Sequence, residues 1–147
     1  MKNKGFSMVE LIIVIAVMAI LAGFLAPALV RYINKSRLSA DIDTGRTLAT
    51  AIQSAIADES ARDDAVDQLA PCKLSDMQGP IFKEVVSEII PVDKIEGKAR
   101  KDVDGGPLDG NFYYILDPEK NMVQIYYGGA DDDHMIYPQT GKKLIEQ

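Results

Sequence analysis

The hydrophobic pattern of the chain begins with an apolar run of twenty residues, 11–30, that contains no charge. As an α-helix this run is about 30 Å long at about 1.5 Å per residue, which matches the hydrocarbon thickness of a bilayer. Glu10 stands at its front edge, with four mostly apolar residues, 6–9, ahead of it. The pattern therefore predicts a membrane-spanning helix that carries a carboxylate where a charge is costly.

A second helical pattern follows, and it has only one apolar stripe. Apolar residues there repeat at alternating steps of three and four, which is typical of a helix with one buried face. We expect one continuous helix over 6–58, made of a membrane-spanning part, 6–30, and an amphipathic continuation, 31–58, that packs against the rest of the chain. The stripe consists of Ile42, Gly45, Ala49, Ile52 and Ile56. The expected exposed side consists of Thr47, Thr50 and Ser54.

The residues after this helix indicate a loop and then a second helix. The polar residues 58–75 predict a helix end and a connecting loop, broken by Pro71. Gly79-Pro80 opens a helix at about 80–90, because proline in a first turn lacks only an N–H that would be unpaired anyway. Pro91 ends it. The predicted apolar face of this helix consists of Ile81, Phe82, Val85, Val86, Ile89 and Ile90.

The end of the chain predicts strands. Residues 94–110 are charged and glycine-rich, which indicates an exposed loop. The runs NFYYILD and NMVQIYY, separated by the turn-like DPEKN, predict a β-hairpin at about 111–128, and HMIYP can add a third strand. The expected fold class is α+β, with the long helix packed on a small antiparallel sheet in a head at 59–147. Four tyrosines suit cross-strand packing and contacts between subunits: Tyr113, Tyr114, Tyr126 and Tyr127.

Length and net charge limit the possible classes of function. With 147 residues the chain has room for one modest domain. Its net charge of -6 predicts an acidic surface, which would repel phosphate groups and so disfavours nucleic acid as a partner of the isolated subunit. Cys72 is the only cysteine, so no internal disulfide forms, and we interpret it as structural or incidental rather than as a reactive thiol.

Catalytic patterns are missing. His134 is the only histidine, which excludes sites that need several, and no phosphate-binding glycine loop follows a strand. We therefore expect no enzyme and no cofactor. One cation site is conceivable, because three consecutive acids after Gly128-Gly129 can offer oxygens to Ca²⁺; the alternative is a solvated acidic loop. These acids are Asp131, Asp132 and Asp133.

Two interpretations of the apolar run use no family knowledge. Lys2 and Lys4 before it and Ala26-Pro27-Ala28 within it are features of a secretory signal peptide, but the run is longer than a usual signal core and Glu10 does not suit one. A plain membrane anchor fits the length. Its orientation stays open, because basic residues lie on both sides: Lys2 and Lys4 before the run, and Arg31, Lys35 and Arg37 after it.

The N-terminal residues also resemble a known family. "KG" followed by "FSMVE" and a long apolar helix resembles the type IV pilins and pseudopilins, closely over about thirty residues and beyond that only in layout. The resemblance implies that residues 1–5 are a leader, cut after Gly5 by a prepilin peptidase. It implies that Phe6 becomes the N-methylated N-terminus and that Glu10 is the assembly residue. Ala19 departs from the pattern, since many members carry glycine there.

The resemblance suggests a physical role for the carboxylate. In a staggered filament, Glu10 of one subunit can face the Phe6 amine of a neighbour, and this pair would select register and direction more than it adds stability. The alternative is that Glu10 reaches the lipid headgroups from the helix end. Gly23 and Pro27 predict a helix kink, either an ordinary one or a point where a filament extends.

The leading hypothesis is a structural subunit of a type IV pilus-like surface filament. The precursor is expected in the cytoplasmic membrane as a single-pass protein with a cytoplasmic N-terminus, and the mature chain in an extracellular filament. Its implied partners are other copies of itself, the prepilin peptidase, and a membrane assembly platform with its ATPase. One alternative is a pseudopilin of a type II secretion or DNA-uptake system. Another is a single-pass membrane-anchored extracellular binding protein.

Overall fold

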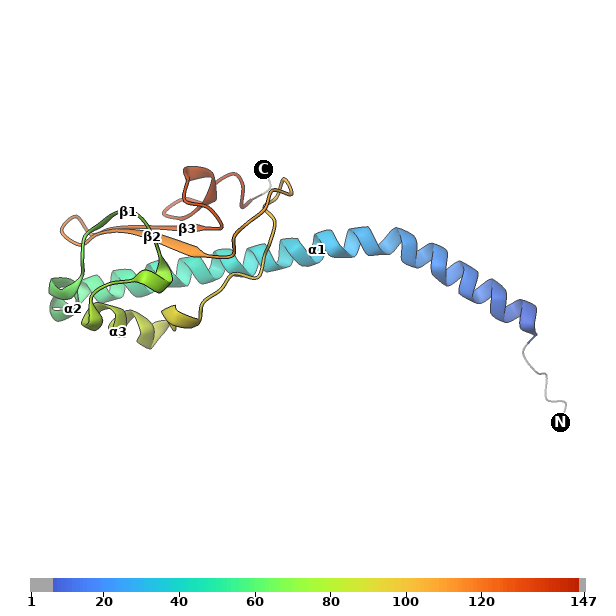
Figure 1. Ribbon diagram of the computed structural model, residues 1–147, viewed down its shortest axis with the longest axis horizontal. Coiled ribbons are helices and arrows are strands. Elements are labelled where there is room, and N and C mark those ends of the chain that lie inside the picture. Colours follow the sequence, from blue (N-terminus) through green and yellow to red (C-terminus); the bar gives the residue numbers. More distant parts are fainter. Residues whose placement is uncertain (1–6, 146–147) are drawn as a thin grey trace, which may run out of the picture. The chain divides into compact units, whose positions relative to one another are not determined.

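The computed structural model describes residues 7–145. These divide into two compact units, with the boundary between Ile33 and Asn34. Three short 3-10 turns, Leu74–Asp76, Val92–Lys94 and Asp132–His134, connect the regular elements. In chain order these elements, shown in Figure 1, are α1 (Met8–Ala57), α2 (Glu59–Asp64), β1 (Gln68–Lys73), α3 (Pro80–Ile89), β2 (Phe112–Asp117), β3 (Met122–Tyr127) and β4 (Met135–Tyr137).

Helix α1 has two chemically different parts. The large apolar side chains from Met8 to Ile33 are 39–79% exposed, and within this helix lies a segment of mean hydropathy 2.8 that is long and apolar enough to cross a membrane. Beyond residue 37 one face of the helix is buried, and it includes the whole predicted stripe from Ile42 to Ile56. Thr47, Thr50 and Ser54 are exposed, as the pattern predicted.

The second part of α1 packs on a four-stranded antiparallel sheet of order β1-β2-β3-β4. Strands β2 and β3 pair in full register, from Phe112 opposite Tyr127 to Asp117 opposite Met122. Because side chains alternate between the faces of a strand, every second residue of this hairpin enters the core. The predicted α+β class is thereby confirmed. The buried residues of the hairpin on this face are Phe112, Tyr114, Leu116, Val123, Ile125 and Tyr127.

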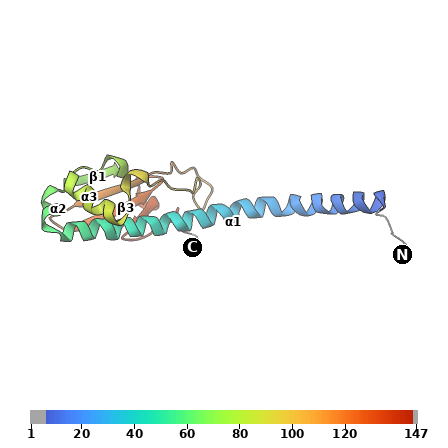
Figure 2. The same ribbon diagram turned by 90° about the horizontal axis from the view of Figure 1, so that it is seen from below.

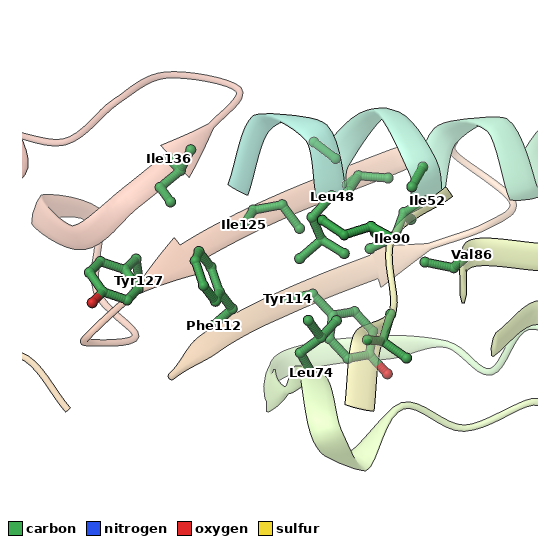
Figure 3. Packing of buried hydrophobic residues seen from close by; sticks show 14 of the residues in the cluster. Leu48, Ile52, Leu74, Val86, Ile90, Phe112, Tyr114, Ile125, Tyr127 and Ile136 are labelled. Carbon is green, nitrogen blue, oxygen red and sulfur yellow. The ribbon is translucent and has the colours of Figure 1, made fainter. Parts of the chain in front are cut away.

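The core lies between α1, α3 and the sheet. Figure 3 shows Leu48 and Ile52 of α1 pointing into the same space as Ile125 of β3 and Ile90, the residue after α3. Figure 2 shows α3 and the sheet along the same stretch of α1. At Gly45 the contact is too close for a side chain, because a Cβ there would overlap Ile136 of β4. The glycine in the predicted stripe therefore lets the sheet approach the helix.

The prediction of a helix end and a connecting loop at 58–75 misses a strand. Helix α2 and strand β1 occupy this segment, and Pro71 lies inside β1. The proline is tolerated because β1 is an edge strand that pairs only with β2, and the register shifts between Gln68 and Cys72. Most of β1 is exposed, so it lacks the alternation by which a half-buried strand is recognised.

The predicted apolar face of the second helix is only half right. Phe82, Val86 and Ile90 are buried, whereas Ile81 and Ile89 are 47% and 50% exposed. The buried residues are four apart, so they form one narrow line on a short helix that contacts the core along a single side. The other apolar residues, including the partly exposed Val85, lie beside that line.

Residues 94–110 form a loop, as predicted, but the loop is less exposed than expected. The segment has no regular strand, but Ala99, Asp102 and Leu108 are buried. Asp102 turns the chain back on itself, because its carboxylate accepts the backbone N–H groups of Asp104 and Gly106 at 3.0 and 2.6 Å. The loop is therefore packed against the head rather than free in solvent.

Candidate assembly site

In the first turn of α1 the side chains of Glu10 and Ser7 each accept one backbone N–H group. The backbone N–H of Ser7 donates to Glu10 Oε2 at 2.9 Å, and the backbone N–H of Val9 donates to Ser7 Oγ at 3.3 Å. This is a capping box, in which two N–H groups left unpaired at the helix start are satisfied by side chains three positions apart. The sequence contains its signature, Ser-x-x-Glu before an apolar run, which our reading of the sequence missed.

The capping box gives Glu10 a role inside its own subunit. A helix N-terminus carries a partial positive charge, which stabilises a nearby carboxylate. Among residues 7–145, the structure gives a hydrogen-bond donor only to Oε2, and the Glu10 side chain is exposed. The carboxylate is therefore held at the start of the helix with one oxygen still open. Gly5 and Phe6, the predicted cleavage and methylation residues, lie outside the described residues.

Gly23 and Pro27, the two predicted kink residues, are the two ends of one helical hydrogen bond that cannot form. Pro27 lies inside α1, which continues through it. An α-helix pairs each N–H with the carbonyl four residues earlier, and proline has no N–H, so the carbonyl of Gly23 loses its helical donor. No side chain approaches within 4 Å of the place where a Cβ of Gly23 would stand. The two residues thus mark one weakened turn in the apolar part of α1.

The apolar surface of the first unit is much larger than a soluble protein exposes. From Met8 to Ile33 the helix presents large aliphatic side chains on all sides, and the apolar segment has no part buried within the chain. Soluble monomers rarely leave contiguous apolar patches beyond a few hundred Å². Such a surface is suited to contact with lipid or with the apolar surfaces of other chains.

The candidate calcium residues do not converge. Asp131 Oδ1 accepts the backbone N–H groups of Asp133 and His134 and contacts His134 Nδ1 at 2.8 Å. Partial burial alone would raise the pKa of Asp131, but the hydrogen bonds and charge of His134 outweigh it and lower that pKa. Within residues 7–145 no group of three or more histidine, cysteine, aspartate or glutamate side chains is arranged to hold a metal ion.

A buried carboxylate on α1 fixes the 94–110 loop. Asp41 is 3% exposed and accepts the N–H of Lys98 at 2.8 Å and that of Ala99 at 2.7 Å. Tyr127 completes the arrangement by donating its hydroxyl to the Ala99 carbonyl at 2.6 Å. The sequence could have indicated Asp41, because the helical steps from Leu38 to Gly45 pass through it.

The four predicted tyrosines serve the head rather than a shared site. Tyr114, Tyr126 and Tyr127 are buried, and the Tyr127 and Phe112 rings are 4.9 Å apart. Tyr113 donates its hydroxyl to Asp109 at 2.5 Å. The Tyr127 and Phe112 rings pack across the hairpin, as predicted, while Tyr113 bonds to the preceding loop, and the predicted subunit contacts remain a prediction.

Cys72 lies partly buried in β1. Burial raises the pKa of its thiol, which lowers the fraction of reactive thiolate. The geometry therefore gives no support to a reactive cysteine.

Comparisons with known proteins agree with this architecture. The family described as a prokaryotic N-terminal methylation motif matches residues 1–26. A type IV major fimbrial protein FimA of Dichelobacter nodosus is 33% identical over 145 residues, which are 97% of this chain and 79% of the relative. A fimbrial protein of the same organism is also 33% identical over 145 residues with the same coverage, and another FimA protein is 29% identical over 144. No solved structure matches the chain.

A methylation motif on an apolar helix, followed by an antiparallel head, defines a subunit of the pilin class. The chain belongs to the type IV fimbrial protein family, as its identity to the FimA protein over almost its whole length shows. The resemblance seen in the N-terminal residues is confirmed. The relatives are structural fimbrial proteins, and their similarity supports a structural role for this chain rather than an enzymatic one.

Proposed function

We propose that this chain is the repeating subunit of a type IV surface filament and polymerises through α1. The observation that carries the proposal is the apolar part of this helix, which is exposed along its whole length, with Glu10 at its start. The similarity to major fimbrial proteins supports it. Before assembly the bilayer would cover the apolar surface, and in the filament the same surfaces of neighbouring copies would cover it, so the helix never meets water.

Maturation would supply the charge that Glu10 needs. Cleavage after Gly5 by a prepilin peptidase leaves the Phe6 amine as a new cation, which is then methylated. The capping box holds Glu10 Oε2 on Ser7, while Oε1 is available to the Phe6 amine of an adjoining copy. The desolvation of both charges offsets much of their attraction, so the pair chiefly fixes the stagger between subunits. Extraction from the membrane would require an assembly platform and its ATPase.

The weakened turn at Gly23 and Pro27 would give the polymer a point of extension. One helical hydrogen bond is already absent there, so unwinding that turn costs less than unwinding its neighbours. An ordinary kink without mechanical role is the alternative. Measuring the extension of single fibres with Pro27→Ala distinguishes the two, because restoring the hydrogen bond should stiffen the fibre only if this turn unwinds under load.

A pseudopilin of a type II secretion or DNA-uptake system shares this assembly chemistry. The relatives, which are named as fimbrial proteins, favour the pilus. DNA uptake would call for basic surface, whereas the chain carries a net charge of -6. A membrane-anchored binding protein would need no filament, and sheared cell-surface fibres made of this chain would exclude it.

The test compares two substitutions of Glu10. Glu10→Gln keeps a side-chain oxygen for the capping box, since glutamine also serves at this position, but removes the charge. Glu10→Ala removes both. We expect both variants to accumulate in the membrane and both to lower the yield of sheared fibres by about tenfold or more, the equivalent of about 1.4 kcal/mol per subunit contact. Glu119→Gln, an exposed head glutamate, serves as the matched control.

The two variants also distinguish the role of the Glu10 charge from the role of the capping box. Wild-type fibre yield from Glu10→Gln would mean that only the capping box matters, and wild-type yield from both would contradict the proposed assembly. Mass spectrometry of the wild-type subunit should find a chain that begins at methylated Phe6. A chain that begins at Leu29 would instead indicate an ordinary secreted protein.

A further inference from the structure

The second unit carries a basic patch although its net charge is negative. Residues 34–147 contain 13 lysines and arginines against 21 aspartates and glutamates. Four of these basic residues come together where the 94–110 loop packs on α1, and all four are exposed. The basic patch consists of Arg37 of α1 and of Lys98, Arg100 and Lys101 of the loop.

Hydrogen bonds between α1 and the loop bring the patch together. Asn34 Nδ2 donates to the carbonyl of Lys101 at 2.9 Å, and Asp41 accepts the N–H of Lys98 at 2.8 Å. Asn34, Arg37 and Asp41 are three and four residues apart, so they lie on one side of the helix. Arg37 is therefore placed between the two points at which the loop is attached.

The neighbouring acids do not neutralise the patch. Asp41 accepts backbone N–H groups, and Asp102 contacts Lys143 at 3.6 Å. Glu96 is the one exposed acid of the segment 94–101. Within residues 7–145, neither patch lysine takes part in an ion pair. Both lysine charges are thus available to an anionic partner.

The place of the patch in the chain favours a membrane surface as that partner. The apolar run ends at Val30, and Asn34, which bonds to Lys101, follows four residues later. At about 1.5 Å per helical residue this is about 6 Å of chain, comparable to the roughly 5–7 Å of headgroups on each side of the hydrocarbon. Headgroup phosphates are therefore the first anions that this stretch meets when the apolar run spans a bilayer.

We propose that the basic patch of the unassembled subunit binds the phosphate groups of anionic phospholipids at the membrane surface from which α1 emerges. The inference rests on the membrane-spanning state in the proposed function and does not require the filament. Each lysine or arginine near such a surface strengthens binding about fivefold, the equivalent of about 1 kcal/mol. DNA is a weaker candidate, because proteins that hold it mainly by charge make about 6–10 phosphate contacts, more than this patch offers.

The first experiment measures the lipid preference of the full-length chain in an uncharged detergent. Phosphatidylglycerol and phosphatidylcholine with the same acyl chains are added in equal amounts, and native mass spectrometry counts the molecules of each that stay bound. The apolar helix meets the same acyl chains in both lipids, so an excess of phosphatidylglycerol reports on the basic residues. Lys98→Gln with Lys101→Gln should lower this excess by about tenfold or more.

The matched control removes two other exposed charges of the head. Arg62→Gln with Lys73→Gln, on α2 and β1, should leave the lipid preference near the wild-type value. Near-ultraviolet circular dichroism of both double variants shows whether the head is still folded. If the loop pair behaves like this control, the inference is overturned.

Two other partners would also overturn it. One is DNA, if the wild-type chain shows no preference for phosphatidylglycerol but binds duplex DNA through the same two lysines. The other is a neighbouring subunit, if the loop pair lowers fibre yield while the lipid preference stays unchanged.

A second experiment locates the contact in a bilayer with the wild-type chain. The chain is placed in nanodiscs of phosphatidylcholine, with or without phosphatidylglycerol, and a neutral reagent acetylates its lysines. Lys98 and Lys101 should react about fivefold more slowly in the anionic discs, whereas the exposed Lys73 of β1 should react equally in both. Equal rates at Lys98 and Lys101 in the two kinds of disc would overturn the inference. Protected lysines in a chain that never forms fibres would overturn only the proposed filament.

Discussion

Asp41 offers the sharpest test of how the head is held together. Its carboxylate is buried on α1 and accepts two backbone N–H groups of the 94–110 loop, from Lys98 and Ala99, at 2.8 and 2.7 Å. Ala99 itself is fully buried. Asp41→Ala would leave both donors without an acceptor. Asp41→Asn would leave one oxygen to accept both N–H groups, and its NH₂ group would take the place of the second oxygen.

The expected loss in the free energy of unfolding follows from the number of N–H groups that lose their acceptor. A hydrogen bond to a charged group is worth about 1.5–3 kcal/mol, and an unsatisfied buried donor costs about 1–3 kcal/mol. The N–H of Lys98 can regain water, so Asp41→Ala should lower the free energy of unfolding by roughly 2–5 kcal/mol and Asp41→Asn by roughly half as much. In a domain of about a hundred residues, 1 kcal/mol corresponds to roughly 4 °C in Tm. The alanine variant should therefore melt about 8–20 °C below wild type.

The assay is thermal unfolding of the full chain in detergent, followed by near-ultraviolet circular dichroism. The chain has no tryptophan, and five of its six tyrosines lie after residue 112, so this signal reports on the head rather than on α1. Asp43→Ala is the control, because Asp43 is exposed and its contact with Arg46 is a surface ion pair at 3.9 Å. Its Tm should stay within about 2 °C of wild type. If Asp41→Ala also stays within that range, the carboxylate does not hold the loop.

Three further predictions concern the head. Burial raises the pKa of Tyr114 from 10.0 to about 12. The protonated Tyr114 hydroxyl therefore contributes fully to the free energy of unfolding below pH 10, and this contribution is lost as the pH rises toward 12. In Tyr114→Phe the free energy of unfolding should fall less steeply over this pH range than in wild type. Gly97→Ala should destabilise the head by about 1–3 kcal/mol in denaturant melts, since a Cβ there would overlap the Tyr127 ring; an unchanged midpoint would refute this contact. Asp64 accepts two N–H groups at the start of α3, at 2.7 and 3.1 Å, so Asp64→Ala should cost about 1–2 kcal/mol in the same assay, and a neutral result would refute the cap.

The elements with strong periodicity could be predicted from the sequence. The stripe of α1 from Ile42 to Ile56 is buried as expected, because its helical period continues over several turns. The strands β2 and β3 lie within the predicted hairpin, since two short apolar and aromatic runs flank a polar turn. In both cases one face of a regular element packs against the core, so apolar residues at these positions predict the element.

The missed features depend on contacts that a local pattern does not carry. Strand β1 is an edge strand with a proline and little burial, so nothing in its pattern distinguished it from a loop. The burial of Ala99 depends on Asp41, which lies 58 positions away in the chain. The exposure of Ile81 depends on how little of a ten-residue helix the core can cover. The capping box was missed although its signature is local, with Ser7 and Glu10 only three residues apart; Glu10 itself was predicted from its place before the apolar run and from the family resemblance.

The measurement that bears most directly on the proposed assembly is a high-resolution map of the filament at the start of α1. We expect a carboxylate oxygen of Glu10 to lie within about 4 Å of the Phe6 amine of an adjoining copy, in surroundings without water. A map in which Glu10 contacts only its own Ser7 and solvent, with every Phe6 amine far away, would contradict it.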